Sequence, residues 1–233
     1  GPCRALRMTE AATAPRVLSA STVAETRWLR LSTLSYVDQT GRERQWDCIS
    51  RTTRPAESDV DGVAILALLR SGSSIETLLV EQFRPPVNTF TIELPAGLVD
   101  KGETAAEAAL RELREETGFF GSIISTSPPV ALSPGLTDES VRLCVLDVDL
   151  DAPENASPKQ CLEDGEFIRV RRVPLDQLEQ LLATRASDGL VPFCGLQMLV
   201  AGFCLGMRTR PQDPRGVDGP GERKSGRDAC LAG

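Results

Sequence analysis

The chain of 233 residues contains no histidine, and this absence excludes several kinds of catalytic chemistry. A Ser-His-Asp triad, a Cys-His pair and a zinc site with imidazole ligands all need the histidine ring. Any catalysis must therefore use carboxylates and cationic side chains, which are plentiful at 33 Asp plus Glu and 26 Lys plus Arg.

The chain also lacks the features that mark nucleic-acid binding, membrane insertion and secretion. Its formal net charge of −7 disfavours attraction to DNA or RNA. The most apolar window, residues 192–207, is shorter than the roughly 20 apolar residues that cross a bilayer, so it predicts a buried helix. The seven cysteines are scattered and form no C-x-x-C pair, which is typical of reduced thiols inside a cell. We expect a cytoplasmic protein, with the nucleus as a further location and organelle targeting by the basic residues 1–20 as an alternative.

The residues that are present favour a folded chain with many strands. Residues 28–37 and 44–53 are rich in β-branched and aromatic side chains and flank a turn-forming sequence at 38–41, which predicts an antiparallel hairpin. Residues 62–69 and 76–83 predict a second hairpin in the same way. Shorter runs predict strands at residues 90–94, 123–127, 141–150 and 167–173.

Helix signals are clearest at residues 104–117, which follow a predicted loop at 95–103. Thr104 is a suitable N-cap, Glu107 completes a capping box, and Gly118 marks the C-terminal end. A second helix is predicted to begin near Pro174. Residues 208–233 contain prolines, glycines and charges with almost no large apolar side chains, so we expect a disordered tail.

The segment from Gly97 to Phe119 fits the pattern G-x5-E-x7-R-E-U-x-E-E-x-G-U, where U is apolar. At about 100° per residue, Glu112, Glu115 and Glu116 share one flank of the predicted helix. Crowded carboxylates repel one another, and a hard divalent cation relieves the repulsion. The pattern therefore predicts a Mg²⁺ site, with Mn²⁺ as an alternative.

The competing interpretation of this segment is an ordinary solvated Glu/Arg helix face, which is what most charge runs are. The fixed positions Gly97, Glu103 and Gly118 argue against it, because a plain charged face does not require them. Arg111 is spaced to pair with Glu115 at i, i+4, and Gly97 permits a turn that bulkier residues resist.

The pattern resembles the Nudix box, and further landmarks over about residues 26–206 resemble the ADP-sugar pyrophosphatases of that superfamily. The landmarks are Arg51-Thr-Thr-Arg54, Glu81-Gln-Phe-Arg84-Pro-Pro86, Glu93-Leu-Pro-Ala96-Gly97 and Gly165-Glu166-Phe167. The resemblance implies an α+β fold, with a Nudix α/β/α sandwich and mixed β-sheet at residues 61–207. A small antiparallel β region for dimerisation and adenine binding is implied at 23–60, after a flexible segment at 1–22.

The resemblance also implies Mg²⁺-dependent hydrolysis of the diphosphate bond of ADP-ribose and related ADP-sugars to AMP and sugar phosphate. The metal ligands implied are Glu112, Glu115, Glu116 and the carbonyl of Ala96. Glu166 is the implied general base, in a catalytic group with Glu115 and Arg111. The substrate-binding set comprises Trp28, Trp46, Asp47, Arg51, Arg84, Glu93 and Leu98.

Chemistry supports several of these roles, but each has a plainer alternative. Arg51 and Arg84 can clamp diphosphate oxygens through the planar guanidinium, or they can form structural ion pairs. Trp28 and Trp46 can stack on an adenine, or they can pack in a core. Glu166 can equally be a surface-turn residue.

The resemblance further implies a homodimer, in which the N-terminal sheet is exchanged so that each site draws on both subunits. Asp47 and Ser133 stand where close relatives often carry Glu and Asp, which leaves the substrate preference open. One alternative is a pyrophosphatase for a UDP-sugar or an oxidised nucleoside diphosphate. Another is a catalytically silent ADP-ribose-binding protein, against which the intact Arg111-Glu112 and Glu115-Glu116 pairs argue.

Overall fold

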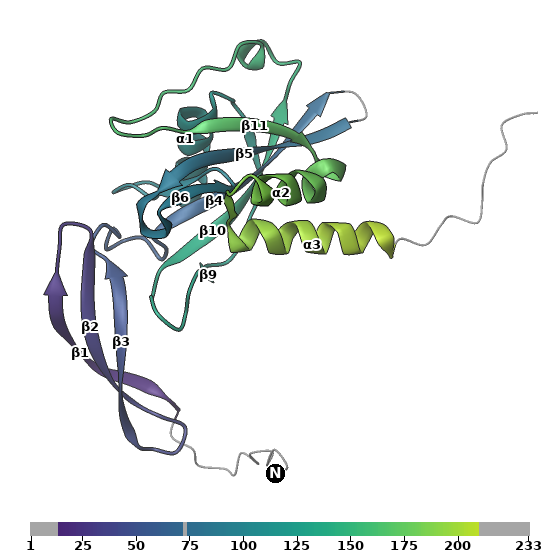
Figure 1. Ribbon diagram of the computed structural model, residues 1–233. Helices are drawn as coiled ribbons and strands as arrows, with labels where there is room; N and C mark the ends of the chain where they lie inside the picture. The colour runs from purple at the N-terminus through teal and green to yellow at the C-terminus, as the bar shows by residue number, and fades with distance from the viewer. Residues whose placement is uncertain (1–13, 72–73, 210–233) are drawn as a thin grey trace, which may run out of the picture.

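The computed structural model describes residues 14–71 and 74–209, which form a small N-terminal sheet beside a larger sheet with helices on both faces (Figure 1). The expected tail at 208–233 lies outside the described residues from residue 210 onward, whereas Arg208 is the last residue of a helix. The first 13 residues of the expected flexible segment at 1–22 lie outside them as well.

The N-terminal sheet is antiparallel and consists of β1 (Arg16–Glu25), β2 (Leu29–Val37) and β3 (Glu43–Arg51). The predicted hairpin is confirmed as β2 and β3, in which Leu34 lies opposite Trp46. The prediction of a flexible segment is wrong for residues 16–22, because they belong to β1. Every residue of β1 is exposed, so the strand lacks the apolar alternation that a half-buried strand shows in its sequence.

In the part of the chain that the structure describes, the larger sheet has nine strands, with the main order β12-β6-β5-β4-β10-β8. Strand β10 is parallel to β4, whereas β5 is antiparallel to β4 and β6, so the sheet is mixed as predicted. Its strands are β4 (Gly62–Ser71), β5 (Ser74–Arg84), β6 (Thr89–Glu93), β7 (Ala96–Leu98), β8 (Ser122–Thr126), β9 (Val130–Ala131), β10 (Ser140–Asp149), β11 (Arg169–Pro174) and β12 (Val191–Pro192).

The shortest elements differ from the sequence-based expectation. Strand β7 lies within the predicted loop 95–103, where it pairs with β4. Strands β9 and β12 have two residues each, which is too short for any periodic pattern to show. Short 3-10 turns complete the chain: η1 (Pro85–Val87), η2 (Pro153–Asn155) and η3 (Leu175–Gln177). Because η3 intervenes, the helix expected near Pro174 begins at Leu178 instead.

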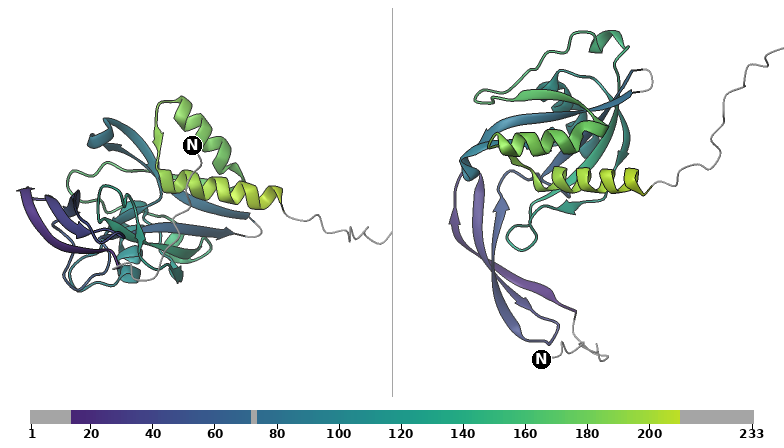
Figure 2. Two further views of the ribbon diagram at one scale, coloured as in Figure 1. Left: turned by 90° about the horizontal axis from the view of Figure 1, so that it is seen from below. Right: turned by 45° about the vertical axis from the view of Figure 1, so that its right-hand side comes forward.

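Within the described residues, three α-helices cover the larger sheet, with α1 on one face and α2 and α3 on the other (Figures 1 and 2). They are α1 (Ala105–Thr117), α2 (Leu178–Ser187) and α3 (Cys194–Arg208). The two helical layers around a mixed sheet confirm the predicted α/β/α sandwich, and the separate antiparallel sheet confirms the predicted N-terminal β region.

Helix α1 begins and ends where its sequence signals indicate. The Thr104 hydroxyl accepts a hydrogen bond from the Glu107 backbone, and the Glu107 carboxylate accepts one from the Thr104 backbone. Gly118 ends the helix at φ 78°, a left-handed conformation that favours glycine. These local interactions fix the position of the acidic residues on the last two turns.

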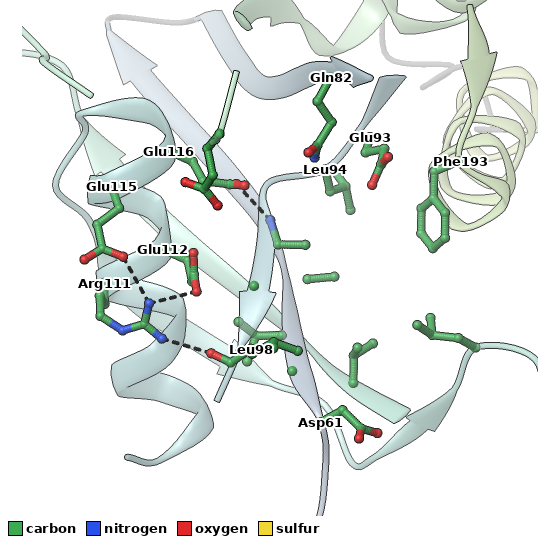
Figure 3. A pocket seen from close by; sticks show the side chains of 18 of the residues that line it. Asp61, Gln82, Glu93, Leu94, Leu98, Arg111, Glu112, Glu115, Glu116 and Phe193 are labelled. Carbon is green, nitrogen blue, oxygen red and sulfur yellow. Dashed lines mark hydrogen bonds and ion pairs between the residues drawn. The ribbon is translucent and has the colours of Figure 1, made fainter. Parts of the chain in front are cut away.

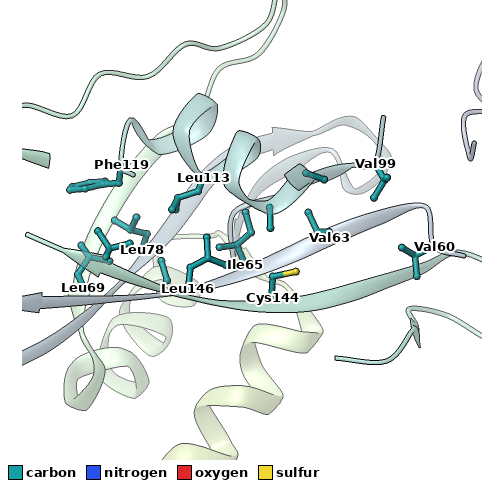
Figure 4. Packing of buried hydrophobic residues seen from close by; sticks show 14 residues of the cluster. Val60, Val63, Ile65, Leu69, Leu78, Val99, Leu113, Phe119, Cys144 and Leu146 are labelled. Carbon is teal, nitrogen blue, oxygen red and sulfur yellow. The ribbon is translucent and has the colours of Figure 1, made fainter. Parts of the chain in front are cut away.

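The hydrophobic cores lie on both faces of the sheet because neighbouring strand residues point in opposite directions. Leu78 packs in the core beneath α1, together with Ile65, Leu113 and Leu146 (Figure 4). The adjacent Leu79 packs in the core beneath α2 and α3. The apolar face of helix α1 therefore packs against the sheet, and its acidic flank lies at the edge of the sheet.

Helix α3 contains most of the apolar window at residues 192–207, but the prediction of a buried helix is only partly right. Leu196 and Val200 are buried, whereas Met198 and Leu205 on the opposite side are exposed. None of the described helices is both long enough and apolar enough to cross a membrane.

The two sheets are joined by hydrogen bonds at the end of β3. The Arg54 guanidinium binds the buried carboxylate of Asp61, which also accepts a hydrogen bond from the Ser140 backbone. The Ile49 backbone donates to the Leu136 carbonyl at 3.0 Å, so the loop before β10 packs along β3. This junction brings N-terminal residues to the mouth of the cleft described below.

Candidate active site

A cleft of about 510 Å³ lies between the acidic flank of α1, strands β4 to β7 and the loop before β10 (Figure 3). Three guanidinium groups and nine carboxylates line it, a balance of 3 − 9 = −6 if all are ionised. The cations are Arg51, Arg84 and Arg111; the carboxylates are Asp61, Glu93, Asp100, Glu112, Glu115, Glu116, Glu139, Glu163 and Glu166. Such a cleft repels an anionic ligand unless further positive charge is supplied.

Glu112 projects from α1 directly against the backbone of β7. A Cβ atom on Gly97 would lie 1.9 Å from Glu112 Oε1, which no real structure permits. The expected turn is wrong, because Gly97 lies in strand β7 and does not have a positive φ, but the expectation that bulkier residues are resisted there is confirmed. The glycine is required instead because the carboxylate occupies the space of a side chain.

Arg111 uses all three of its nitrogens to fasten the acidic helix to the preceding loop. Nε and Nη2 donate to Glu103, and Nη2 also donates to the Leu98 carbonyl. Nη1 donates to Glu112 at 2.8 Å and to Glu115 at 3.0 Å, which confirms the predicted i, i+4 pair. With every donor engaged, Arg111 acts as a support for the glutamates and has little capacity to bind a substrate.

Glu116 is the most deeply buried carboxylate on the α1 side of the cleft, with only 4% of the residue exposed, and of the whole lining only Asp61 is more buried, at 2%. Its Oε2 accepts a hydrogen bond of 3.0 Å from the Ala96 backbone N–H. Burial raises the pKa of Glu116 to about 8, and the negative charges of Glu112 and Glu166 act in the same direction. Burial also raises the pKa of Glu112, although Arg111 opposes the shift.

The donor set of this flank suits a hard divalent cation. In each of Glu112, Glu115 and Glu116 one oxygen is hydrogen-bonded, and the structure shows no described donor for the other oxygen. The raised pKa values show that a nearby positive charge would stabilise the ionised forms. Described acidic and cysteine side chains form no group of three or more that is already arranged around an ion. The roles of these glutamates and of the Ala96 carbonyl as ligands therefore stay predictions.

Arg84 stands near the glutamates and is oriented by Glu93. Its Nε and Nη2 donate to the two oxygens of Glu93 at 2.9 and 3.0 Å. Burial alone raises the pKa of Glu93, but hydrogen bonds from Arg84 and Thr91 outweigh it and lower the pKa. Glu93 therefore remains ionised and holds one edge of the guanidinium, while Nη1 of Arg84 faces no described acceptor.

Arg51 reaches the cleft from the end of β3 in the N-terminal sheet. Its Nε donates to Glu139 Oε1 at 2.5 Å, and both residues line the cleft. Leu98 also lines the cleft, although its carbonyl is occupied by Arg111. Of the predicted substrate-binding set, the structure thus brings Arg51, Arg84, Glu93 and Leu98 together.

Glu166 lies in a turn after Gly165, whose φ of 88° favours glycine. The backbone N–H of Glu163 donates to Glu166 Oε2 at 2.9 Å, and both glutamates line the cleft. This loop is fastened to α1 by Gln160, whose side-chain amide donates to the Glu116 carbonyl at 2.6 Å. Glu166 is close enough for its charge to raise the pKa of Glu116, as a base beside a metal site would be.

Trp28 and Trp46 do not line the cleft, and they cannot stack on one adenine within a single chain. Trp46 lies opposite Leu34, six residues along β2 from Trp28, which places the two backbone positions about 20 Å apart at about 3.3 Å per residue. Both indoles are about half exposed, so the core-packing alternative is wrong too. The Arg27 guanidinium covers Trp28 at 4.3 Å, and Trp46 Nε1 donates to the Gly135 carbonyl at 3.2 Å.

Asp47 also lies away from the cleft of its own chain. Its Oδ1 accepts a hydrogen bond of 2.9 Å from the Thr33 hydroxyl on β2. Because neighbouring strand residues point to opposite faces, Asp47 is on the other side of the sheet from Trp46. Asp47 therefore contributes to the described cleft only if a second copy of the N-terminal sheet approaches it.

Several residues that line the cleft or support its walls were not singled out from the sequence. Asp61, Glu139 and Phe193 line it, but they belong to no motif and are brought in by strand pairing and the loop before β10. Gln160 was missed as well, because its role depends on two backbone carbonyls that meet only in the fold. No local sequence signal distinguishes these four residues from surface positions.

Comparisons with known proteins agree with this geometry. A model of the NUDIX domain matches residues 60–193. The chain is 47% identical over 195 residues to a Saccharomyces cerevisiae protein named ADP-ribose pyrophosphatase, covering 82% of this chain and 84% of that protein. It is 36% identical over 163 residues to a Mus musculus protein named ADP-sugar pyrophosphatase, covering 70% and 74%.

A solved structure supports the fold alone. The structure described as an ADP compounds hydrolase superposes with a TM-score of 0.58 at 20% sequence identity. The match covers 85% of this chain and 98% of that one, so it includes most of the described elements.

Proposed function

The chain belongs to the NUDIX domain family, and from this premise we propose that it hydrolyses ADP-ribose and related ADP-sugars to AMP and a sugar phosphate. The names of the yeast and mouse relatives support this substrate class. The observation that carries the proposal is the crowded carboxylate pair of half-buried Glu112 and buried Glu116, which lines one cleft together with two oriented arginines.

The charge balance of the cleft supports Mg²⁺ as the cofactor. A diphosphate adds negative charge to a lining in which nine carboxylates face three guanidinium groups, so we expect it to bind together with cations. Oxygen donors on Glu112, Glu115 and Glu116 are the kind that Mg²⁺ prefers, and Mn²⁺ accepts them too. When bound, the divalent cation would neutralise phosphate charge and lower the pKa of a coordinated water.

We assign roles to the remaining residues from the donor and acceptor atoms that have no hydrogen-bond partner among the described residues. Arg84 offers Nη1, and Arg51 offers both terminal nitrogens, to the oxygens of the diphosphate. Glu166 accepts the proton of the attacking water, because it lines the cleft and its charge reaches both Glu112 and Glu116. Arg111 keeps Glu115 in place, and Leu98 supplies an apolar surface beside the phosphates.

Adenine recognition requires a second subunit in this proposal. Trp28 and Trp46 are too far apart in one chain to enclose a base, and both are exposed. Val17 and Val23 on β1 are exposed as well, which leaves apolar area for a partner sheet. A homodimer that exchanges this sheet would place Trp28 of one copy and Trp46 of the other on opposite faces of one adenine.

The proposal is tested by measuring Mg²⁺-dependent release of AMP from ADP-ribose, beside UDP-glucose and an oxidised guanosine diphosphate. The Glu112→Gln variant removes one carboxylate of the cleft and is expected to lose activity by at least about 100-fold. Glu154→Gln is the matched control, because Glu154 is exposed and lies outside the cleft. Hydrolysis of UDP-glucose or the oxidised nucleotide alone would overturn the substrate class. Mg²⁺-dependent binding of ADP-ribose without any hydrolysis would instead show a silent binder.

A further inference from the structure

The three arginines of the cleft differ in how many of their nitrogens are already engaged. Arg111 donates from Nε, Nη1 and Nη2, and Arg84 donates from Nε and Nη2. Arg51 donates only from Nε, to Glu139, and among the described residues no acceptor binds its terminal nitrogens. Arg51 therefore carries the largest unused donor capacity of any cation in the cleft.

Glu139 is held in place by the backbone around it. Its own N–H donates to the Thr137 hydroxyl at 3.3 Å, and its carbonyl accepts from the Leu132 N–H at 3.1 Å. The preceding carbonyl, of Asp138, accepts a hydrogen bond of 2.7 Å from Arg54. The carboxylate thus projects from a fixed segment and not from a free loop.

The same segment is tied to the strand that carries Arg51. The Ile49 N–H donates to the Leu136 carbonyl at 3.0 Å, and Trp46 Nε1 donates to the Gly135 carbonyl at 3.2 Å. The backbones that carry Arg51 and Glu139 therefore keep their separation, and the ion pair joins two positions that are already aligned. An ion pair of this kind orients a side chain at little cost in ordering.

We propose that Glu139 is a positioning residue for Arg51: it holds the Nε edge of the guanidinium so that both terminal nitrogens face the diphosphate of the substrate. The inference rests on the proposed function and deepens it. Arginine binds phosphate through two parallel N–H donors, and a guanidinium held by its Nε edge presents such a pair. Without Glu139 the long side chain samples other rotamers, including ones drawn toward the remaining cleft carboxylates.

A different role for Glu139 predicts the opposite change in substrate affinity when Glu139 is removed. If the carboxylate merely neutralised Arg51 and repelled the diphosphate, its removal would tighten substrate binding. Positioning predicts weaker binding on removal, because the oriented donors are lost while the charge of Arg51 remains. The direction of the change in KM therefore separates the two roles.

The experiment compares Glu139→Ala, Glu139→Gln and Arg51→Ala for ADP-ribose hydrolysis in Mg²⁺. Glu139→Ala is expected to raise KM about five- to tenfold with kcat nearly unchanged, because the affected interaction forms on binding. Glu139→Gln keeps an oxygen that can accept from Nε, so it is expected to restore most of the affinity. A lower KM in Glu139→Ala, or no difference between the Ala and Gln variants, would overturn the proposal.

A double variant shows whether Glu139 acts through Arg51. In the Arg51→Ala background, Glu139→Ala is expected to have no further effect on KM. An equal rise in KM in both backgrounds would show that Glu139 acts independently and would contradict the inference. Asp147→Ala is the matched control, since Asp147 pairs with Arg70 through a single Nε contact outside the cleft. It is expected to leave KM unchanged.

Direct binding separates this inference from the proposed function. The dissociation constant of the methylene-bridged analogue of ADP-ribose, measured by calorimetry in Mg²⁺, does not depend on turnover. Binding by the unmodified protein without hydrolysis of ADP-ribose would refute the enzymatic proposal alone, and the Glu139 variants would still be compared by affinity. Normal hydrolysis together with equal analogue affinity in Glu139→Ala would refute the positioning role alone.

Discussion

The Glu116 carboxylate is buried beside the backbone of Ala96, from which it accepts one hydrogen bond. It has lost most of its contact with water, and the negative charges of Glu112 and Glu166 lie near it. Its pKa is raised from 4.5 in the unfolded chain to about 8 in the fold, so the folded protein binds the extra proton between these values. Stability falls with rising pH wherever the folded state binds more protons. The loss of folding stability that ionised Glu116 causes is absent below the unfolded pKa and is complete above about pH 8.

This linkage predicts how metal and pH together affect stability. Without divalent cations, the Tm is expected to fall between about pH 5 and pH 8, and Glu116→Gln is expected to flatten that fall. Added Mg²⁺ is expected to raise the Tm more at about pH 8 than at pH 5, because it stabilises the ionised carboxylates. Thermal melts in chelator and in Mg²⁺ at both pH values test this. An equal Mg²⁺ effect at both would contradict a site built on Glu116.

At the scale of single residues, the sequence identified the acidic side chains of the cleft but not their partners. Glu112, Glu115 and Glu116 were predictable because helical spacing alone places them on one flank. Glu139 and Gln160 were not, because their partners Arg51 and the Glu116 carbonyl are distant in the sequence. The spacing of residues within one helix can be calculated from the sequence, whereas contacts between elements depend on the whole fold.

At the scale of elements, α1 was predictable almost to the residue and the shortest strands were not. The capping box at Thr104 and the left-handed Gly118 are local interactions, so the sequence alone specifies the ends of the helix. Strand β7 has three residues and β1 has no buried face, so neither carries a periodic signal. These strands form because neighbours supply hydrogen-bond partners along their edges.

The contact between α1 and β7 supports a prediction about Gly97. Gly97→Ala places a methyl group on the Glu112 carboxylate, so either the carboxylate or the strand must shift. Because the proposed metal site depends on that carboxylate, activity is expected to fall by at least about 100-fold, and a higher Mg²⁺ concentration is expected to restore part of it. Kinetics as a function of Mg²⁺ concentration measure both effects.

The control for this prediction is Gly202→Ala on α3. Gly202 has no atom within 4 Å of an added Cβ and does not have a positive φ. Alanine there is expected to leave kcat/KM unchanged and to raise stability by about 1 kcal/mol, as in other helix interiors. Normal activity in Gly97→Ala would show that the close approach of Glu112 to β7 is not needed for catalysis.

At the scale of the whole molecule, the described chain brings together the residues proposed to bind the diphosphate but not the two tryptophans proposed to bind the adenine. The glutamates, Arg51 and Arg84 come together within one copy, whereas the backbone positions of Trp28 and Trp46 are about 20 Å apart. The sequence indicated that both tryptophans belong to one hairpin region, but their separation follows from the strand register. A partner subunit is the simplest way to bring two such rings to one base.

Mixing two variants tests whether each site uses tryptophans from both subunits. Trp28→Ala and Trp46→Ala dimers are each expected to bind ADP-ribose weakly, because stacking on the adenine is lost. After subunit exchange, half of the dimers are mixed, and each mixed dimer has one site with both tryptophans and one with neither. Activity at low substrate concentration should therefore recover to about a quarter of the unmodified level. If each site used only the tryptophans of its own chain, mixing the two variants would not restore activity. A monomeric mass measured by light scattering would also contradict a site shared between subunits.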